Sequence, residues 1–331
     1  MNKNNLENLK AEMKGLKFDK QLIAEMEKNM EKDLPAFQLK TTLPSDKGQM
    51  DATLHFKQSG QSDYYFFNKF ELAYSAKAKP LENEQKYMVI SPGEQGKNMM
   101  RSFQSPVDAM EFFKSQKGAS ELALGKPTEK DLQFKTPLAT MKDGKVDYVA
   151  KDFQQTYYGQ TLTNSFYVDK GKGFNVTQAA NMLQGRSAFR DDLVSRAGVG
   201  YQAWNVIAFD KPKDNYGNYK IQQYNENYGF DLKQVLAEYK INMPDDPKKQ
   251  EAIYNELKDG NRPVVSVTGT DGKEVQMRIE AVPRYGNINF YHLNGKPEKR
   301  EDLQKAPTLD QSLSKGQEKQ KGKAESHEMS M

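Results

Sequence analysis

The chain has 331 residues, which is enough for about two domains of ordinary size. Its 49 basic and 45 acidic residues leave a formal net charge of +4, and because the two signs are mixed throughout, charge alone does not argue for nucleic acid as a partner. The sequence has no cysteine, which excludes disulfides, thiolate nucleophiles and cysteine-bound zinc.

Two helices are predicted at the start of the chain. Leucine and methionine residues between positions 6 and 16 recur at helical spacing, but their neighbours are very polar, so we expect this helix to be peripheral. The second helix, over 18–32, is better defined. Asp19 can accept a hydrogen bond from a free backbone N–H at its start, and Phe18 can pack on Ile23 one turn later.

Strands are predicted to follow, over 36–74. Apolar and polar residues alternate from 52 to 57, which is the pattern of a strand with one buried face. After a turn of serine, glycine and aspartate, the run Tyr64–Phe67 is apolar on both faces, which favours a position in the centre of a sheet.

Residues 75–160 have the pattern of a separate module. A polar linker leads to a short strand, KYMVIS, and Ser105 then begins a helix that has Pro106 in its first turn. Asp108 lies near the positive end of that helix. The segment SELAL fits a helix or a strand, and KVDYVAKDF is predicted to be a strand.

The following region, 161–300, is predicted to mix helices and strands. The strand SFYVD precedes a helix in which Asn175 and Gln178 have capping-box spacing and Gly185 ends the last turn. YQAWNVIAFD and KIQQY form a predicted hairpin, and Asp231 begins the next helix. The last residues, 301–331, have too few apolar side chains to offset the entropy of ordering and are predicted to be disordered.

Two stretches of the chain are similar to each other. Residues 35–69 and 263–294 both start with proline and run through three strand-like segments separated by glycine-containing turns. Each follows an amphipathic helix, over 18–32 and 247–258, although a second likeness pairs 18–26 with 230–239 and leaves the partners of the helices open. This internal repeat predicts that one αβββ unit occurs twice in the chain, which favours a binding scaffold over a single catalytic pocket.

These patterns predict an α+β fold. We expect repeated small αβββ units with mainly antiparallel sheets, an inserted α/β module and a disordered tail. The predicted parts are an N-terminal unit (1–74), the inserted module (75–160), a C-terminal α+β domain with the second αβββ unit (161–300) and the tail (301–331).

No catalytic, cofactor-binding or metal-ligating residue is assigned from the sequence. The three histidines, His55, His292 and His327, are far apart, whereas metal sites need clustered ligands. SPGEQGKNM lacks the spacing of a phosphate-binding loop, and Gly171-Lys172-Gly173 lacks the third glycine of a dinucleotide loop, so both are interpreted as turns.

Five residues are candidates for contact with a partner or a nucleic acid: Tyr64, Tyr65, Arg186, Arg284 and Tyr285. Aromatic residues on a sheet beside lysine or arginine can stack on unpaired bases, although the same residues are more often part of a core, as is expected of Trp204. Arg186 follows the glycine that ends a helix, so it can offset the negative helix end or meet a ligand.

Four collinear stretches carry a family resemblance: DATLHFKQSGQSDYYFFN, FYVDKGKGFNVTQAANMLQGRSAFRDDLV, YQAWNVIAFD…YGNYKIQQYNENYGFDL and DGKEVQMRIEAVPRYGNINFY. Over residues 15–74 and 160–300 the chain resembles a family of domain-of-unknown-function proteins from Bacteroidetes conjugative elements and plasmids. The resemblance implies an accessory protein of a mobile element, often encoded near topoisomerase or mobilisation genes, with no agreed catalytic residues. It also implies that residues 75–160 are an insertion.

The expected function is therefore that of a non-enzymatic accessory protein, without cofactors, that binds DNA or a DNA-processing partner. The alternative is a protein–protein adaptor or counter-defence factor that makes no contact with nucleic acid. The N-terminus lacks a signal-peptide pattern and no run approaches the roughly 20 apolar residues of a membrane span, so we expect a cytoplasmic protein without membrane contact.

Overall fold

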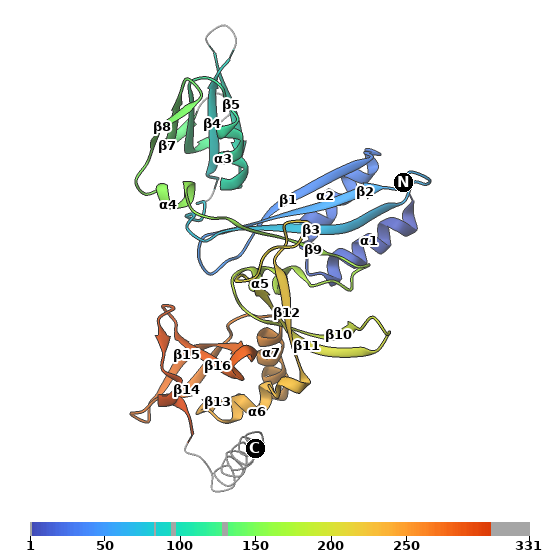
Figure 1. The fold of residues 1–331 in the computed structure, drawn as a ribbon, viewed down its shortest axis with the longest axis vertical. Coiled ribbons are helices and arrows are strands. Elements are labelled where there is room, and N and C mark those ends of the chain that lie inside the picture. The colour runs from blue at the N-terminus through green and yellow to red at the C-terminus, as the bar shows by residue number, and fades with distance from the viewer. Residues whose placement is uncertain (1, 83, 94–96, 128–131, 306–331) are drawn as a thin grey trace, which may run out of the picture. The chain divides into compact units, whose positions relative to one another are not determined.

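The computed structural model describes residues 2–82, 84–93, 97–127 and 132–305. Contacts divide the chain into two compact units, residues 1–223 and 224–331 (Figure 1). Within the described ranges, no helix has both the length and the apolar character needed to cross a membrane.

The first unit is built on a four-stranded antiparallel sheet in the order β1-β2-β3-β9. Its strands are β1 (Ala36–Leu43), β2 (Gln49–Gln58), β3 (Tyr65–Ser75) and β9 (Leu162–Tyr167). Strand β3 lies between β2 and β9 and is therefore central. The run Tyr64–Phe67 itself lies at the start of the strand, where Tyr65–Phe67 pair with β2 and the ladder with β9 has not yet begun; that ladder starts at Lys69.

Helices cover one face of this sheet. They are α1 (Lys3–Gly15), α2 (Lys20–Glu31) and α5 (Val176–Leu183), and Figure 1 shows the first two lying along the sheet. The strands of the sheet alternate accordingly. The β2 residues that face the helices are buried and apolar: Met50, Ala52, Leu54 and Phe56. Those that face away are polar: Asp51, Thr53, His55 and Lys57.

The core of the first unit is rich in aromatic side chains. Phe70 of β3 is fully buried, with its ring edge-on to Phe18 at 5.3 Å and stacked on Phe166 at 5.5 Å. Burying a side chain of this size stabilises the fold by roughly 1.5–3 kcal/mol. The expectation that the first helix is peripheral is wrong. Met13 of α1 is fully buried, and the Asn5 side chain donates to the carbonyl of Tyr65 at 2.9 Å.

The helix starts and ends follow the capping residues in the sequence. Asp19 accepts from the N–H of Leu22 at 2.8 Å, and Asn175 and Gln178 form the predicted capping box. Ser105 and Asp231 likewise cap α3 (Pro106–Lys114) and α6 (Leu232–Ala237). Gly185 adopts a φ of +87°, which is the left-handed conformation that only glycine takes easily after a helix.

A second sheet of the first unit lies in the predicted insertion. Its five strands are antiparallel in the order β5-β4-β6-β7-β8, and α3 packs on them. The strands are β4 (Lys86–Pro92), β5 (Asn98–Phe103), β6 (Ser120–Pro127), β7 (Leu132–Lys142) and β8 (Lys145–Val149), followed by α4 (Gln154–Tyr157). The ambiguous segment SELAL is part of β6, whereas β5 and β7 are not predicted from the sequence.

Three more strands form a small sheet in the order β10-β11-β12. They are β10 (Ala188–Val194), β11 (Gly200–Ala208) and β12 (Lys220–Asn225), so the predicted hairpin of the last two is confirmed. Trp204 of β11 is buried against the ring of Phe189 at 5.3 Å, as expected for a core residue.

The second unit has a five-stranded antiparallel sheet whose strands follow one another in sequence. These are β13 (Ile241–Asn242), β14 (Val264–Thr268), β15 (Glu274–Val282), β16 (Asn287–His292) and β17 (Pro297–Glu298), with α7 (Pro247–Lys258) before β14. Short 3-10 turns span Glu226–Tyr228, Pro283–Tyr285 and Arg300–Leu303. Residues 301–305 of the predicted tail join this unit through buried Leu303, and the remainder, 306–331, lies outside the described residues.

The predicted α+β class with mainly antiparallel sheets is confirmed. Each of the two similar stretches, with the helix before it, forms a helix followed by three strands, and each strand pairs with the next one along the chain: α2-β1-β2-β3 and α7-β14-β15-β16. Shared ancestry of the two stretches stays a prediction. So do the four part boundaries, although the pairing of β9 with β3 joins residues on either side of the insertion in one sheet.

Candidate functional site: an acidic groove on the open face of the first sheet

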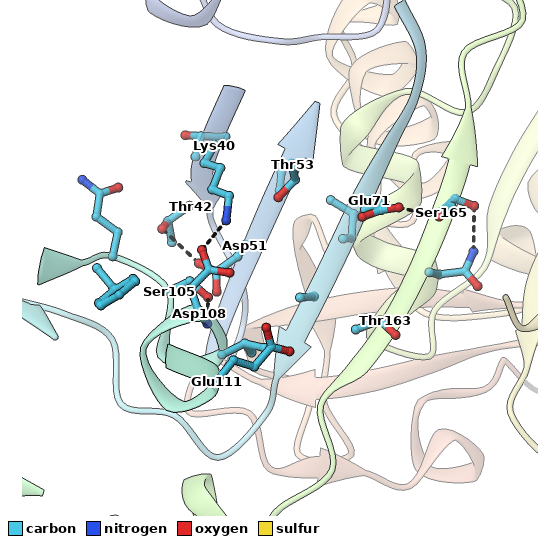
Figure 2. A pocket seen from close by; sticks show the side chains of 18 of the residues that line it. Lys40, Thr42, Asp51, Thr53, Glu71, Ser105, Asp108, Glu111, Thr163 and Ser165 are labelled. Atoms are coloured by element: carbon cyan, nitrogen blue, oxygen red, sulfur yellow. Dashed lines mark hydrogen bonds and ion pairs between the residues drawn. The ribbon is translucent and has the colours of Figure 1, made fainter. Parts of the chain in front are cut away.

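A groove of about 1250 Å³ lies on the face of the first sheet that the helices leave open (Figure 2). Its floor is made by outward-facing residues at one end of four neighbouring strands. In cross-strand rows these are Thr42, Asp51, Ala73 and Thr163, then Lys40, Thr53, Glu71 and Ser165. Because strand residues alternate between faces, a polar residue at every second position provides a polar floor without disturbing the core beneath it.

Three elements form the banks of the groove. The first is the segment from Arg101 in β5 to Glu111 in α3, and Figure 2 shows Ser105, Asp108 and Glu111 beside the strands of the floor. The second is the loop between β11 and β12, which contributes Lys213, Tyr216 and Asn218. The third is the start of α2, with Asp19 and Glu25; since α2 covers the other face of the sheet, the cavity is not confined to the open face. We refer to the cavity with this floor and these banks as the acidic groove.

Acidic side chains outnumber basic ones in the groove. The six acids are Asp19, Glu25, Asp51, Glu71, Asp108 and Glu111, and the three bases are Lys40, Arg101 and Lys213.

Each base is already engaged within the protein. Lys40 pairs with Asp108, the Arg101 guanidinium lies 4.5 Å from the ring centre of Phe112, and the Lys213 ammonium lies 4.2 Å from that of Tyr219. By contrast, Glu25 and Glu111 form no ion pair with any described residue. The site therefore suits a positively charged or neutral polar ligand and repels phosphates.

Asp51 occupies the most enclosed part of the floor. Its Oδ1 accepts from the Thr42 hydroxyl at 3.2 Å and from the Gln49 amide at 2.8 Å, and the same amide donates to the carbonyl of Gln104 at 2.6 Å. Asp51 Oδ2 and Gln49 Oε1 are both buried and accept no hydrogen bond from the part of the chain that the structure describes.

The surroundings of Asp51 favour its protonated form. Burial raises the pKa of Asp51, polar groups of Gln49, Ser105 and Thr42 oppose the rise, and the charge of Asp108 adds to it. Even with Asp51 neutral, acids still outnumber bases in the groove.

Glu71 holds a fixed negative charge at the centre of the sheet face. Its carboxylate lies 2.5 Å from the Lys69 ammonium, 3.2 Å from Nε2 of His55 and 3.3 Å from the Ser165 hydroxyl, which donates to it. Partial burial acts to raise the pKa of Glu71, but the Lys69 hydrogen bond and the neighbouring His55 outweigh it, and the pKa is lowered.

The groove also reaches the free edge of β1, since Lys40, Thr41 and Thr42 line it and β2 is the only described strand that pairs with β1. The Gln58 N–H donates to the carbonyl of Pro35, so positions 35, 37, 39, 41 and 43 form the hydrogen-bonded pairs of this antiparallel ladder. The backbone N–H and C=O groups of Gln38, Lys40 and Thr42 therefore point away from β2. They form no ladder bond with another described strand.

None of the five predicted contact residues lines the groove, and the structure divides them between the two units. Tyr64 is 39% exposed just before β3, whereas Tyr65 is buried, with its hydroxyl donating to the carbonyl of Leu34 at 2.8 Å. Arg186 is buried and its guanidinium lies 3.5 Å from the Asp46 carboxylate. Arg284 and Tyr285 are exposed in the second unit, with the guanidinium 5.7 Å from the ring centre.

The sequence carries only part of the signal for the groove. The polar, outward positions of β2 follow from the alternation that predicts the strand. That Ser105, Asp108 and Glu111 of α3 meet those positions depends on how the insertion folds back, which no local pattern encodes. Among the described residues there is no cluster of three or more histidine or carboxylate side chains that could hold a metal ion.

Comparison with protein-family models, curated proteins and solved structures finds no match for the chain.

Proposed function

We propose that the protein is a non-enzymatic binding protein whose acidic groove takes an extended, positively charged segment of a partner protein. The observation that carries the proposal is the coincidence of an acidic lining with the free backbone edge of β1. An extended segment can add to such an edge through main-chain hydrogen bonds while its alternate side chains reach the floor. Of the two forms of the expected function, binding of DNA or of a DNA-processing partner, the groove favours the partner protein.

The resemblance to mobile-element proteins supports a DNA-processing protein as the partner. Proteins that bind nucleic acid carry basic segments, whose side chains would meet Glu25 and Glu111 at the banks of the groove. Direct contact of DNA with the groove is disfavoured, because phosphates would lie against the acidic lining.

The charge requirement is tested with two fluorescent peptides, one of alternating lysine and threonine and one of alternating glutamate and threonine, each about as long as β1. Fluorescence anisotropy should show binding of the lysine peptide at low salt, weakening as salt screens the charges, and no binding of the glutamate peptide. Equal binding of the two peptides, or no binding of the lysine peptide, would contradict the proposal.

The edge requirement is tested by replacing Thr42 in two ways. Thr42→Pro removes the N–H that points away from β2 and leaves the β1–β2 ladder intact, since proline is tolerated on the outer side of an edge strand. Loss of one main-chain hydrogen bond should weaken lysine-peptide binding by roughly 2- to 10-fold.

Thr42→Val is the matched comparison, because it removes the hydroxyl bond to Asp51 but keeps the backbone N–H. We expect a smaller loss of peptide binding than with Thr42→Pro. If the two variants weaken binding equally, the peptide does not add to the edge of β1.

A further inference from the structure

The opposite end of the same sheet face carries a different set of side chains. One cross-strand row there contains Gln38, His55, Lys69 and Tyr167, and the next contains Ala36, Lys57 and Phe66. Each aromatic residue in these rows is thus directly opposite a lysine. Phe66 is 50% exposed and Tyr167 is 58% exposed.

Exposed aromatic rings are unusual at these positions. Phe66 lies near the start of β3, where the strand pairs with β2 and the ladder with β9 has not yet begun, and no described element covers its ring enough to bury it. Tyr64, two residues earlier, continues the alternation toward the same face and is 39% exposed. The inner face of β3 supplies the core through Phe67 and Phe70, so the outward aromatic residues are not needed for packing.

We infer that this end of the sheet binds single-stranded nucleic acid, with bases stacked on Phe66 and Tyr167 and a phosphate beside Lys57. We refer to these three residues as the aromatic platform. The inference is independent of the peptide proposed for the acidic groove, since it concerns different residues and the opposite charge.

The charge of the platform suits this ligand. Lys57 is exposed and has no ion-pair partner among the described residues, so its ammonium is available to a phosphate. The Lys69 ammonium is already paired with the Glu71 carboxylate at 2.5 Å, so Lys57 is the phosphate contact. Flat apolar rings beside a free ammonium group match bases on a phosphate backbone, because stacking accepts any base and the lysine contacts a phosphate.

Binding is measured by fluorescence anisotropy with labelled oligothymidylate and oligouridylate of about 15 nucleotides. We expect binding of one or both at low salt, and the two probes distinguish DNA from RNA as the source. Binding should weaken as salt rises, because phosphate contacts release counterions. A duplex of the same length should bind more weakly, since its bases are not free to stack.

Variants assign the binding to the platform. Phe66→Ala and Tyr167→Ala should each weaken binding by roughly 5- to 100-fold, which corresponds to the loss of one stacked base. Lys57→Gln should lower the slope of log affinity against log salt by about 0.7, the value for one lost phosphate contact. Tyr158→Ala is the control, because Tyr158 is 71% exposed but lies outside the sheet, and binding should be unchanged.

Three outcomes would overturn the inference. One is no binding of either single strand at low salt, and another is equal binding of the duplex and the single strands. The third is a dimer in sedimentation experiments that Phe66→Ala converts to a monomer. In that case a second copy of this chain would occupy the platform, which would be an interface between copies.

Discussion

The two ends of the open face of the first sheet share the same strands but differ in chemistry. Toward α3 the outward rows hold Asp51 and Glu71 in a concave, acidic groove, and toward the opposite end they hold Phe66 and Tyr167 beside lysines on an open surface. Beneath both ends the inner face is one continuous apolar core. We infer from this contrast that the inner residues stabilise the sheet, whereas the outer residues are available to bind partners.

The largest expected effect tests this division between faces. Phe70→Ala removes a fully buried ring from the inner face of β3 and should lower the free energy of unfolding by about 3–5 kcal/mol. Phe66→Ala, on the outer face of the same strand, should change it by less than about 0.5 kcal/mol. Urea unfolding followed by the fluorescence of Trp204 measures both, since that residue belongs to the first unit.

A similar loss of unfolding free energy for both substitutions would contradict the division between the two faces. It would mean that Phe66 packs against another part of the chain, so that its ring is not available to a ligand. The unchanged stability of Phe66→Ala is therefore also the condition for using this variant in binding experiments.

The next effect contrasts the two turns that join the strands. Gly48, between β1 and β2 at the groove end, has a φ of +73°, and a side chain there would place its Cβ 2.3 Å from the carbonyl oxygen of Ser75. Gly48→Ala should therefore lower the free energy of unfolding by about 1–3 kcal/mol and also weaken lysine-peptide binding, because the turn holds β1 against Asp51.

Gly60 is the matched control at the other end of the sheet. It lies between β2 and β3, and a Cβ there would meet no atom within 4 Å. Gly60→Ala should change stability by less than about 0.5 kcal/mol. If Gly48→Ala leaves both urea unfolding and peptide binding unchanged, the groove does not depend on the geometry of the β1–β2 turn.

Local features of the sequence predict much of this fold, whereas long-range contacts are not predicted. The capping residues Asp19, Ser105 and Asn175 act within one helical turn, so their patterns locate the helix starts directly. The pairing of β9 with β3 joins residues on either side of the insertion. No periodicity specifies such a partner, because alternation determines which face is buried but not which strand lies alongside.

The candidate sites show the same limit. Tyr64 and its neighbours attract attention in the sequence because they are aromatic, yet sequence alone does not tell which of them face outward. Burial of Tyr65 and exposure of Phe66 follow from a register that only the assembled sheet defines. For the acidic groove the sequence gives no such indication, because polar residues like those of its floor are common on any protein surface. They form a groove only because the insertion places α3 beside them.

The smallest expected effect concerns the charge of the groove floor. Burial raises the pKa of Asp51 above its ordinary value of 3.8, so the folded protein retains this proton to a higher pH than the unfolded chain. Between these two pKa values the unfolded state binds fewer protons, and stability falls as pH rises. Asp51→Asn keeps an acceptor for Thr42 and Gln49 but cannot ionise, so it should gain stability relative to the native protein as pH rises above about 4, where the native side chain begins to ionise in the unfolded chain but not in the folded protein.

Asp192→Asn provides a control of opposite sign. The hydrogen bond from Arg190, at 2.6 Å, lowers the pKa of Asp192, so the native side chain stabilises the fold above its ordinary pKa and loses this contribution as pH falls. Asp192→Asn should therefore be less stable than the native protein by a constant amount above about pH 4, and this deficit should shrink as pH falls below about 4. If Asp51→Asn behaves like Asp192→Asn, Asp51 is held as a stabilised anion. The groove end would then carry more negative charge at neutral pH, and its contrast with the aromatic platform would be sharper than the pKa direction implies.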